Sequence, residues 1–186
     1  MSRQCYQAPL PEGVGALAPG GKPRGRISRG GDNEAWGVSL SHSGSWVLCS
    51  LGRGESGVDV ETEAEEGEEI AKLVFLPEEV AALQQMTPPD RKEFFLRCWT
   101  TKESYLKYTG EGLAGDLSKL DCTALWQGQQ PVAVKNFLLP DGAVAGICAR
   151  RDGLPSQVKY IPLERLKDFL AGMGGKRGKM CVEKYF

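Results

Sequence analysis

The stretch "FFLRCWTTKESYLKYTGEG", residues 94–112, has the apolar spacing of a buried helix but is interrupted by a charged pair. At about 100° per residue, its apolar side chains form one stripe, made of Phe95, Cys98, Trp99 and Leu106. Lys102 falls inside this stripe, and Glu103 and Lys107 lie along its edge. Because an unpaired ammonium is costly to bury, Lys102 either extends its stem to solvent or meets an anion.

The elements around this helix predict an α+β fold with antiparallel sheet. Alternating apolar residues bounded by turn residues predict a hairpin over 35–51 and further strands over 57–61, 117–125, 131–139 and 143–151. Helices are predicted over 76–86 and 91–108, and 162–173 forms a last amphipathic stretch. Since strands and helices do not alternate regularly, a parallel βαβ sheet is disfavoured. The Gly/Pro-rich residues 1–34 are expected to form an irregular, partly mobile arm, and residues 35–186 the domain.

Composition excludes several classes of protein. The chain has 186 residues, of which 41% are hydrophobic and 25% charged, as in ordinary globular proteins. Its net charge of −1 says little about partners, but basic residues cluster early and acidic residues crowd residues 61–69, which is unlike a uniformly basic nucleic-acid binder. The chain contains no apolar run long enough for a membrane span. Its first residues do not resemble a signal peptide, so a reducing cytoplasm is predicted. The six scattered cysteines are interpreted as thiols, and a single histidine, His42, argues against a mixed Cys/His zinc site.

The segment "GVDVE", residues 57–61, places two carboxylates on one face of a strand. Side chains alternate along a strand, so Val58 and Val60 are expected in the core while Asp59 and Glu61 project together, about 7 Å apart. Such a pair suits Mg²⁺, which binds a few carboxylate oxygens together with water and substrate phosphate. The alternative is a solvated strand face that continues into the acidic run after Thr62.

The segment "SLSHSGSW", residues 39–46, offers a second constellation. His42 is predicted at a strand end beside Ser41 and Ser43, and imidazole plus hydroxyls at a turn can hold a phosphate. A Ser/His hydrolase is a weaker interpretation, because the chain has no G-x-S-x-G elbow and adjacent strand residues point to opposite faces. A structural role for His42 stays open.

Taken together, these segments resemble the 4′-phosphopantetheinyl transferases of the larger, Sfp-like class. The resemblance rests on "GVDVE" followed by "FFLRCWTTKESYLKYTGEGL", with "KP" at Lys22–Pro23 and "VSLSHSGSWVLCSL" upstream, in the family's order. It extends from Lys22 to the segment "AVAGICARR", residues 143–151. It implies a fold of two pseudo-symmetric α+β halves with the active site between them, the first half being reduced in this chain.

The resemblance also implies a reaction and residue roles. Such enzymes transfer the 4′-phosphopantetheine arm of coenzyme A to a serine of an apo carrier protein, in the presence of Mg²⁺. Matching motif positions make Asp59, Glu61 and Glu103 the magnesium ligands, and Glu103 the general base, acting directly or through a water. Lys107 would pair with the diphosphate, and Lys102 would be a secondary phosphate contact or a positioner. Ser41 and His42 would hold the 3′-phosphate end of coenzyme A, with Lys22 nearby.

The implied partners are coenzyme A and an acyl or peptidyl carrier protein of fatty-acid, polyketide or nonribosomal peptide biosynthesis. No nucleic acid or membrane is expected, and the chain is expected to be a monomer or to self-associate weakly. Arg24, Arg26 and Arg29 are further candidates for phosphate contacts. One alternative is a non-catalytic remnant that binds coenzyme A or the carrier protein. Another is a different Mg²⁺-dependent phosphotransferase, which the lack of a G-x-x-x-x-G-K-[ST] loop disfavours.

Overall fold

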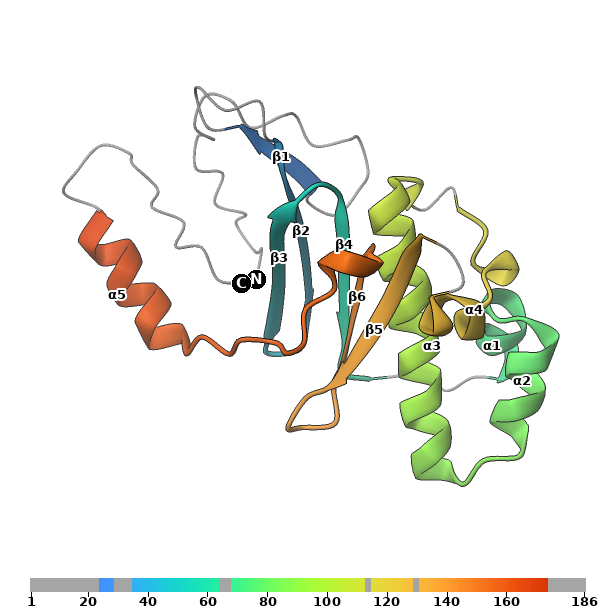
Figure 1. Ribbon diagram of the computed structural model, residues 1–186. Helices are drawn as coiled ribbons and strands as arrows, with labels where there is room; N and C mark the ends of the chain where they lie inside the picture. Colours follow the sequence, from blue (N-terminus) through green and yellow to red (C-terminus); the bar gives the residue numbers. More distant parts are fainter. Residues whose placement is uncertain (1–23, 29–34, 64–67, 113–114, 129–130, 174–186) are drawn as a thin grey trace, which may run out of the picture. The chain divides into compact units, whose positions relative to one another are not determined.

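The computed structural model describes residues 24–28, 35–63, 68–112, 115–128 and 131–173 (Figure 1). The chain divides into two compact units, Gly15–Leu154 and a smaller one made of Met1–Val14 with Pro155–Phe186. The predicted boundary after residue 34 stays a prediction, since residues 29–34 are outside the described ranges. Apart from one strand, the predicted arm lies outside the described residues.

The first sheet has the order β1-β2-β3, and all of its pairs are antiparallel. Its strands are β1 (Arg24–Ser28), β2 (Ala35–Ser43) and β3 (Trp46–Arg53). The predicted hairpin is confirmed as β2 and β3, which turn at Gly44 with φ of 55°. The prediction of irregular structure through residue 34 was wrong for β1. Its pairing with β2 supplies the strand's backbone hydrogen bonds, although the Gly-rich and basic sequence of β1 has no strand periodicity of its own.

The second sheet has the order β4-β6-β5 and is also antiparallel. Its strands are β4 (Ser56–Glu61), β5 (Val132–Leu138) and β6 (Val144–Arg150), close to the predicted ranges. Val58 and Val60 are fully buried, as their alternation predicted. Two antiparallel sheets with packed helices confirm the predicted α+β class.

The helix α3 (Pro88–Thr109) lies against the second sheet (Figure 1). A side chain at Gly57 would place its Cβ 2.0 Å from the backbone oxygen of Ser104, and one at Gly146 would be 2.5 Å from that of Thr100. Two glycines therefore allow helix and strands to approach closely. The helix starts before the predicted residue 91, because Pro88 is tolerated in a first turn.

Short helices complete the larger unit. They are α1 (Glu68–Val74), α2 (Pro77–Gln84), the 3-10 turn η2 (Leu117–Lys119), α4 (Cys122–Gln127) and the 3-10 turn η3 (Arg151–Gly153). The strand predicted over 117–125 was wrong. The Asp121 side chain accepts hydrogen bonds from the backbone N–H groups of Thr123 and Ala124, which caps a helix at this point. The core between the helices includes Ala71, Phe75, Leu83, Phe95, Cys98 and Cys122.

In the smaller unit, α5 (Leu163–Met173) confirms the predicted amphipathic stretch as a helix. The side chains of Leu163 and Leu166 on this helix are exposed. Among the helices that the structure describes, none combines the length and the apolar character needed to span a membrane.

Candidate active site

Serine hydroxyls on β2 join the first sheet to β4, the edge strand of the second sheet. The Val58 N–H donates to Ser39 Oγ at 3.1 Å, and the Thr62 N–H donates to Ser43 Oγ at 3.2 Å. An edge strand leaves backbone groups that need partners, and these hydroxyls provide them. The contact fixes β4 against the face of β2 on which the two serines lie.

Asp59 is fully buried in this contact. Its Oδ1 accepts hydrogen bonds from Ser41 Oγ at 2.8 Å and from Lys107 Nζ at 2.6 Å. Lys107 also donates to the Val58 carbonyl at 2.8 Å, so one ammonium from α3 holds both the side chain and the backbone of β4. A buried carboxylate is tolerated when it is paired and hydrogen-bonded. The alternative of a solvated strand face is therefore excluded for Asp59.

Glu61 lies two residues further on β4 and is partly buried. Its Oε2 accepts a hydrogen bond from Ser43 Oγ at 2.8 Å. Each of the two strand carboxylates thus contacts a serine of β2, Asp59 through Ser41 and Glu61 through Ser43. This arrangement orients both carboxylates from the same neighbouring strand.

Glu103 belongs to the part of α3 that passes over Asp59. Thr100 packs on Gly146, which is the cross-strand partner of Asp59, and Lys107 contacts Asp59 itself. Glu103 lies between these two helix positions, partly buried, and shares a helix face with Lys107 four residues later. The fold therefore brings the helix segment of Glu103 to the strand that bears the other two predicted magnesium ligands.

The structure does not bring Ser41 and His42 together. The Ser41 side chain is buried against Asp59, whereas His42 is exposed and pairs with Val47 of β3. Adjacent strand residues point to opposite faces, which also argues against a Ser/His nucleophile pair. A joint role of these two residues toward the 3′-phosphate stays a prediction, and Lys22 lies outside the described residues.

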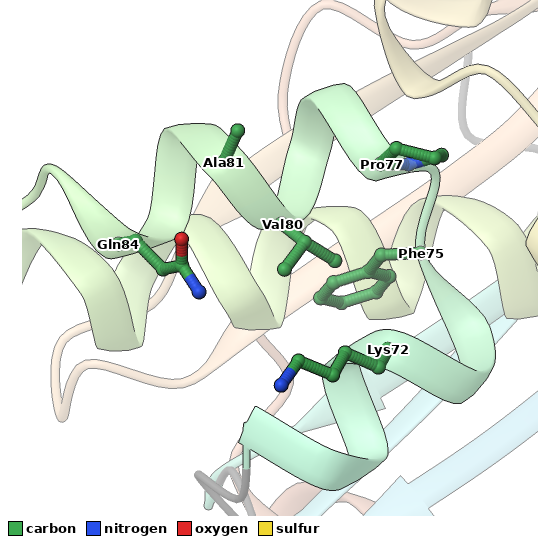
Figure 2. A pocket seen from close by; sticks show the side chains of 6 residues that line it. All are labelled: Lys72, Phe75, Pro77, Val80, Ala81 and Gln84. Carbon is green, nitrogen blue, oxygen red and sulfur yellow. The ribbon is translucent and has the colours of Figure 1, made fainter.

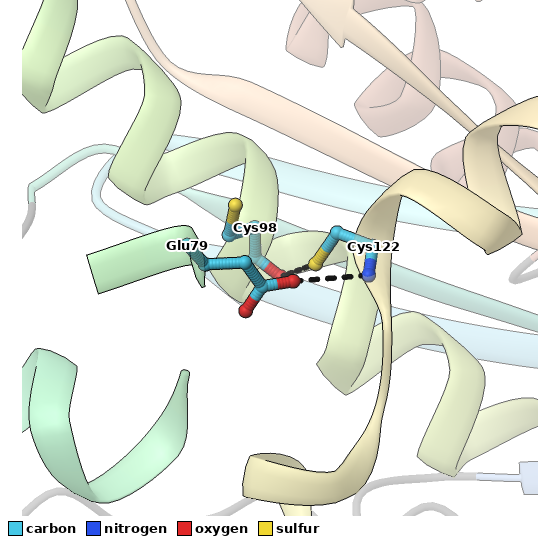
Figure 3. Close-up of side chains that lie close together, drawn as sticks. All are labelled: Glu79, Cys98 and Cys122. Carbon is cyan, nitrogen blue, oxygen red and sulfur yellow. Dashed lines mark hydrogen bonds between the residues drawn. The ribbon is translucent and has the colours of Figure 1, made fainter. Parts of the chain in front are cut away.

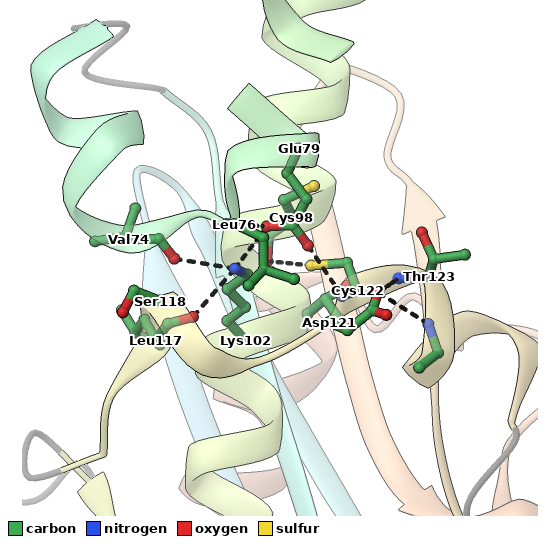
Figure 4. A network of polar contacts seen from close by, with 12 residues as sticks. Val74, Leu76, Glu79, Cys98, Lys102, Leu117, Ser118, Asp121, Cys122 and Thr123 are labelled. Atoms are coloured by element: carbon green, nitrogen blue, oxygen red, sulfur yellow. Dashed lines mark hydrogen bonds and ion pairs between the residues drawn. The ribbon is translucent and has the colours of Figure 1, made fainter. Parts of the chain in front are cut away.

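The position of Lys102 corrects the phosphate contact that the resemblance implied. Its side chain is only 1% exposed, and Nζ pairs with Glu79 Oε2 at 2.6 Å (Figure 4). The carbonyls of Val74 and Leu117 accept its other hydrogen bonds, at 3.0 and 3.1 Å. Three acceptors match the three donors of an ammonium. The sequence left two alternatives open for the Lys102 ammonium, contact with solvent or with an anion. In the structure it contacts an anion, the carboxylate of Glu79.

A second cluster combines Glu79 with the thiols of Cys98 and Cys122 in the same buried region (Figure 3). The ligand atoms of these three residues lie within 4.8 Å of one another. Glu79 already binds the Lys102 ammonium and the Cys122 N–H, and the neighbouring Cys98 thiol and burial raise the pKa of Cys122. Soft thiols do not suit Mg²⁺, and both oxygens of Glu79 already have partners within the protein. We therefore interpret this cluster as part of the core.

A pocket of about 300 Å³ opens between α1 and α2 (Figure 2). Its lining is mostly apolar and consists of Lys72, Phe75, Pro77, Val80, Ala81 and Gln84. None of the predicted site residues lines it. The candidate site is instead the contact between β2, β4 and α3.

The three carboxylates fit a divalent cation. Mg²⁺ binds hard oxygen ligands, usually one or two carboxylates together with water and substrate phosphate. Asp59 and Glu61 carry such oxygens on β4, and Glu103 carries a carboxylate on the α3 segment that packs against this sheet. The serine contacts of the first two restrict their orientation before any ligand arrives. Lys107 adds a positive charge beside them, which suits an anionic substrate.

These features define an α+β protein in which two serine-bound carboxylates of β4 and a lysine of α3 meet. A family model described as the 4′-phosphopantetheinyl transferase superfamily matches residues 55–149, about half of the chain. The chain belongs to this superfamily. The matched range runs from β4 to β6 and includes all three carboxylates and Lys107.

Curated relatives agree with this assignment. Sfp, a 4′-phosphopantetheinyl transferase of Bacillus subtilis (strain 168), is 27% identical over 137 residues, which cover 69% of this chain and 61% of Sfp. Another 4′-phosphopantetheinyl transferase of Bacillus subtilis is 32% identical over the same length and coverage. The Nostoc sp. (strain PCC 7120) 4′-phosphopantetheinyl transferase HetI is 38% identical over 79 residues, 41% of this chain and 33% of HetI. The chain thus spans about 61% of the length of the first two relatives.

Proposed function

We propose that this chain transfers the 4′-phosphopantetheine arm of coenzyme A to a serine of an apo acyl or peptidyl carrier protein, releasing adenosine 3′,5′-bisphosphate. The observation that supports this most is the meeting of Asp59, Glu61 and the Glu103 segment of α3 within the range matched by the family model. The relatives named above are 4′-phosphopantetheinyl transferases, which supports the same reaction.

In this proposal Asp59, Glu61 and Glu103 hold Mg²⁺. When bound, the ion would neutralise charge on the diphosphate of coenzyme A and orient it for displacement. Lys107, already beside Asp59, would stabilise the negative charge of the departing bisphosphate. The buried Ser41–Asp59 contact keeps one carboxylate in place while the diphosphate enters.

Glu103 would also act on the nucleophile. A serine hydroxyl is a weak nucleophile until a base takes its proton, and a carboxylate at the edge of α3 can do this. Glu103 is partly buried, which leaves it open on one side to an incoming serine. His42 remains a candidate for the 3′-phosphate of coenzyme A, because its exposed side chain is accessible from outside the sheet.

The direct test is a transfer assay. A panel of apo carrier proteins from fatty-acid, polyketide and nonribosomal peptide synthesis is incubated with coenzyme A, MgCl₂ and the full chain. Intact-protein mass spectrometry should show the addition of one phosphopantetheine group to at least one carrier. If no carrier in the panel gains this mass at saturating coenzyme A, the proposal is wrong.

A non-catalytic member of the family that binds coenzyme A or the carrier protein is the second candidate. Titrating coenzyme A with and without MgCl₂ separates the two. Binding that is independent of the metal, without transfer to any carrier, would favour the non-catalytic member. The buried thiols Cys98, Cys122 and Cys148 accord with the reducing cytoplasm that we infer as the compartment of either form.

A further inference from the structure

The hydroxyl of Ser43 has a complete set of partners in the structure. Its Oγ lies 2.8 Å from Glu61 Oε2, 3.2 Å from the Thr62 N–H and 3.1 Å from Thr62 Oγ1. A hydroxyl has one proton and two lone pairs. The carboxylate can only accept, and the backbone N–H can only donate. The Ser43 proton therefore goes to Glu61, and Thr62 supplies both donors.

This arrangement fixes the direction of the hydrogen bond. Because the backbone N–H and the hydroxyl of Thr62 occupy both lone pairs of Oγ, the Ser43 hydroxyl has one remaining direction for its proton, toward Oε2 of Glu61. Glu61 has a long side chain that loses rotamer freedom when a donor holds one of its oxygens. Ser43 thus restrains the carboxylate that the strand alone would leave with several orientations.

We propose that Ser43 is a positioning residue that orients Glu61 for binding a divalent cation. The inference rests on the proposed function, because it takes Glu61 as a magnesium ligand. Partners that hold metal ligands in place typically contribute 10- to 100-fold to metal affinity or activity. Ser43 is partly exposed, so water can replace part of its hydrogen bond, and about tenfold is expected.

Ser39 offers a matched control on the same strand and the same face. Its hydroxyl also accepts a hydrogen bond from a β4 backbone N–H, that of Val58. Within the described part of the chain it makes no hydrogen bond to Asp59 or Glu61. Ser39→Ala and Ser43→Ala therefore both remove a hydroxyl that accepts from β4. Only Ser43→Ala also removes a donor to a carboxylate.

The test measures Mn²⁺ binding by electron spin resonance in the full chain with saturating coenzyme A and no carrier protein, so no transfer takes place. Ser43→Ala should raise the dissociation constant for Mn²⁺ about tenfold. Ser43→Thr keeps the hydroxyl and should restore binding to within about threefold of wild type. Ser39→Ala should lower the melting temperature without changing Mn²⁺ affinity. If Ser43→Ala does not fold, Ser43→Cys, which has only a weak S–H donor, replaces it with the same expected direction.

Transfer kinetics provide a second measurement. Ser43→Ala should raise the Mg²⁺ concentration for half-maximal activity while leaving kcat at saturating Mg²⁺ nearly unchanged, because the defect lies in holding the ion. Any of three results would overturn the inference. They are equal Mn²⁺ affinity in wild type and Ser43→Ala, an equal loss of Mn²⁺ affinity in Ser39→Ala, and no Mn²⁺ binding by wild type. Mn²⁺ binding that depends on Ser43, without transfer to any carrier, would support the inference and refute the proposed function alone.

Discussion

Lys102→Met is the substitution that tests the structure most sharply. The Lys102 ammonium and the Glu79 carboxylate form an ion pair at 2.6 Å, with side chains only 1% and 7% exposed. The pair connects α3 to α2, and the carbonyls of Val74 and Leu117 bring the end of α1 and the turn η2 to the same nitrogen. Methionine keeps the apolar stem but removes the charge, so Glu79 stays buried without its cation.

The expected loss follows from the burial of the partner. Removing one member of a buried ion pair typically costs about 3–5 kcal/mol, because the other charge remains desolvated. In Lys102→Met, Glu79 keeps two backbone donors, the N–H groups of Leu76 and Cys122. We therefore expect the free energy of unfolding to fall by about 3 kcal/mol, the lower end of this range. Glu79→Gln leaves the ammonium with two carbonyls and should cost a similar amount. The double variant buries neither charge, so its cost should fall about 2–3 kcal/mol below the sum of the two.

Urea unfolding followed by circular dichroism measures these free energies. Lys119→Met serves as the control, because its ion pair with Asp116 is exposed and should not move the urea midpoint. If each single variant costs less than about 1 kcal/mol, as for surface pairs, Lys102 and Glu79 do not form a buried ion pair in solution. Strict additivity in the double variant would likewise contradict a direct interaction between the two side chains. Since Lys102 is assigned to the core, Lys102→Met that still folds should bind coenzyme A as wild type does.

Three further predictions concern the packing, the base and the thiols. Gly57→Ala should lose about 1–3 kcal/mol of stability because its Cβ would meet the α3 backbone, whereas Gly52→Ala, with open space around it, should change stability little by urea unfolding. Glu103→Gln should abolish carrier modification in the mass assay while leaving the melting temperature within a few degrees of wild type; substantial residual transfer would remove Glu103 from the role of base. Burial raises the pKa of Cys148 to about 12, so little of its reactive thiolate is present at pH 8. Iodoacetamide at this pH should label the exposed Cys49 and leave the buried Cys148 unlabelled until urea unfolds the chain. Peptide mass spectrometry measures the labelling.

The charged pair in α3 illustrates what local sequence patterns can predict. The helical stripe predicted Lys102 within the core, and this is confirmed. The cost of burying an unpaired ammonium predicted that its nitrogen would reach either solvent or an anion. The sequence could not identify Glu79 as this anion, because Glu79 lies on another helix and no spacing rule links it to Lys102. The same limit explains the strand predicted over 117–125. Its alternation was real, but the Asp121 cap, together with packing on α3, favoured a helix.

The candidate site depends on a match between two strands that the sequence shows only separately. Ser39, Ser41 and Ser43 recur at the same period of two as Asp59 and Glu61, so one packed pair of strands gives each carboxylate a hydroxyl. Shifting β2 by one residue would turn these serines away and remove both donors together. The position of β2 along β4 therefore controls the orientation of both strand carboxylates that we propose as metal ligands.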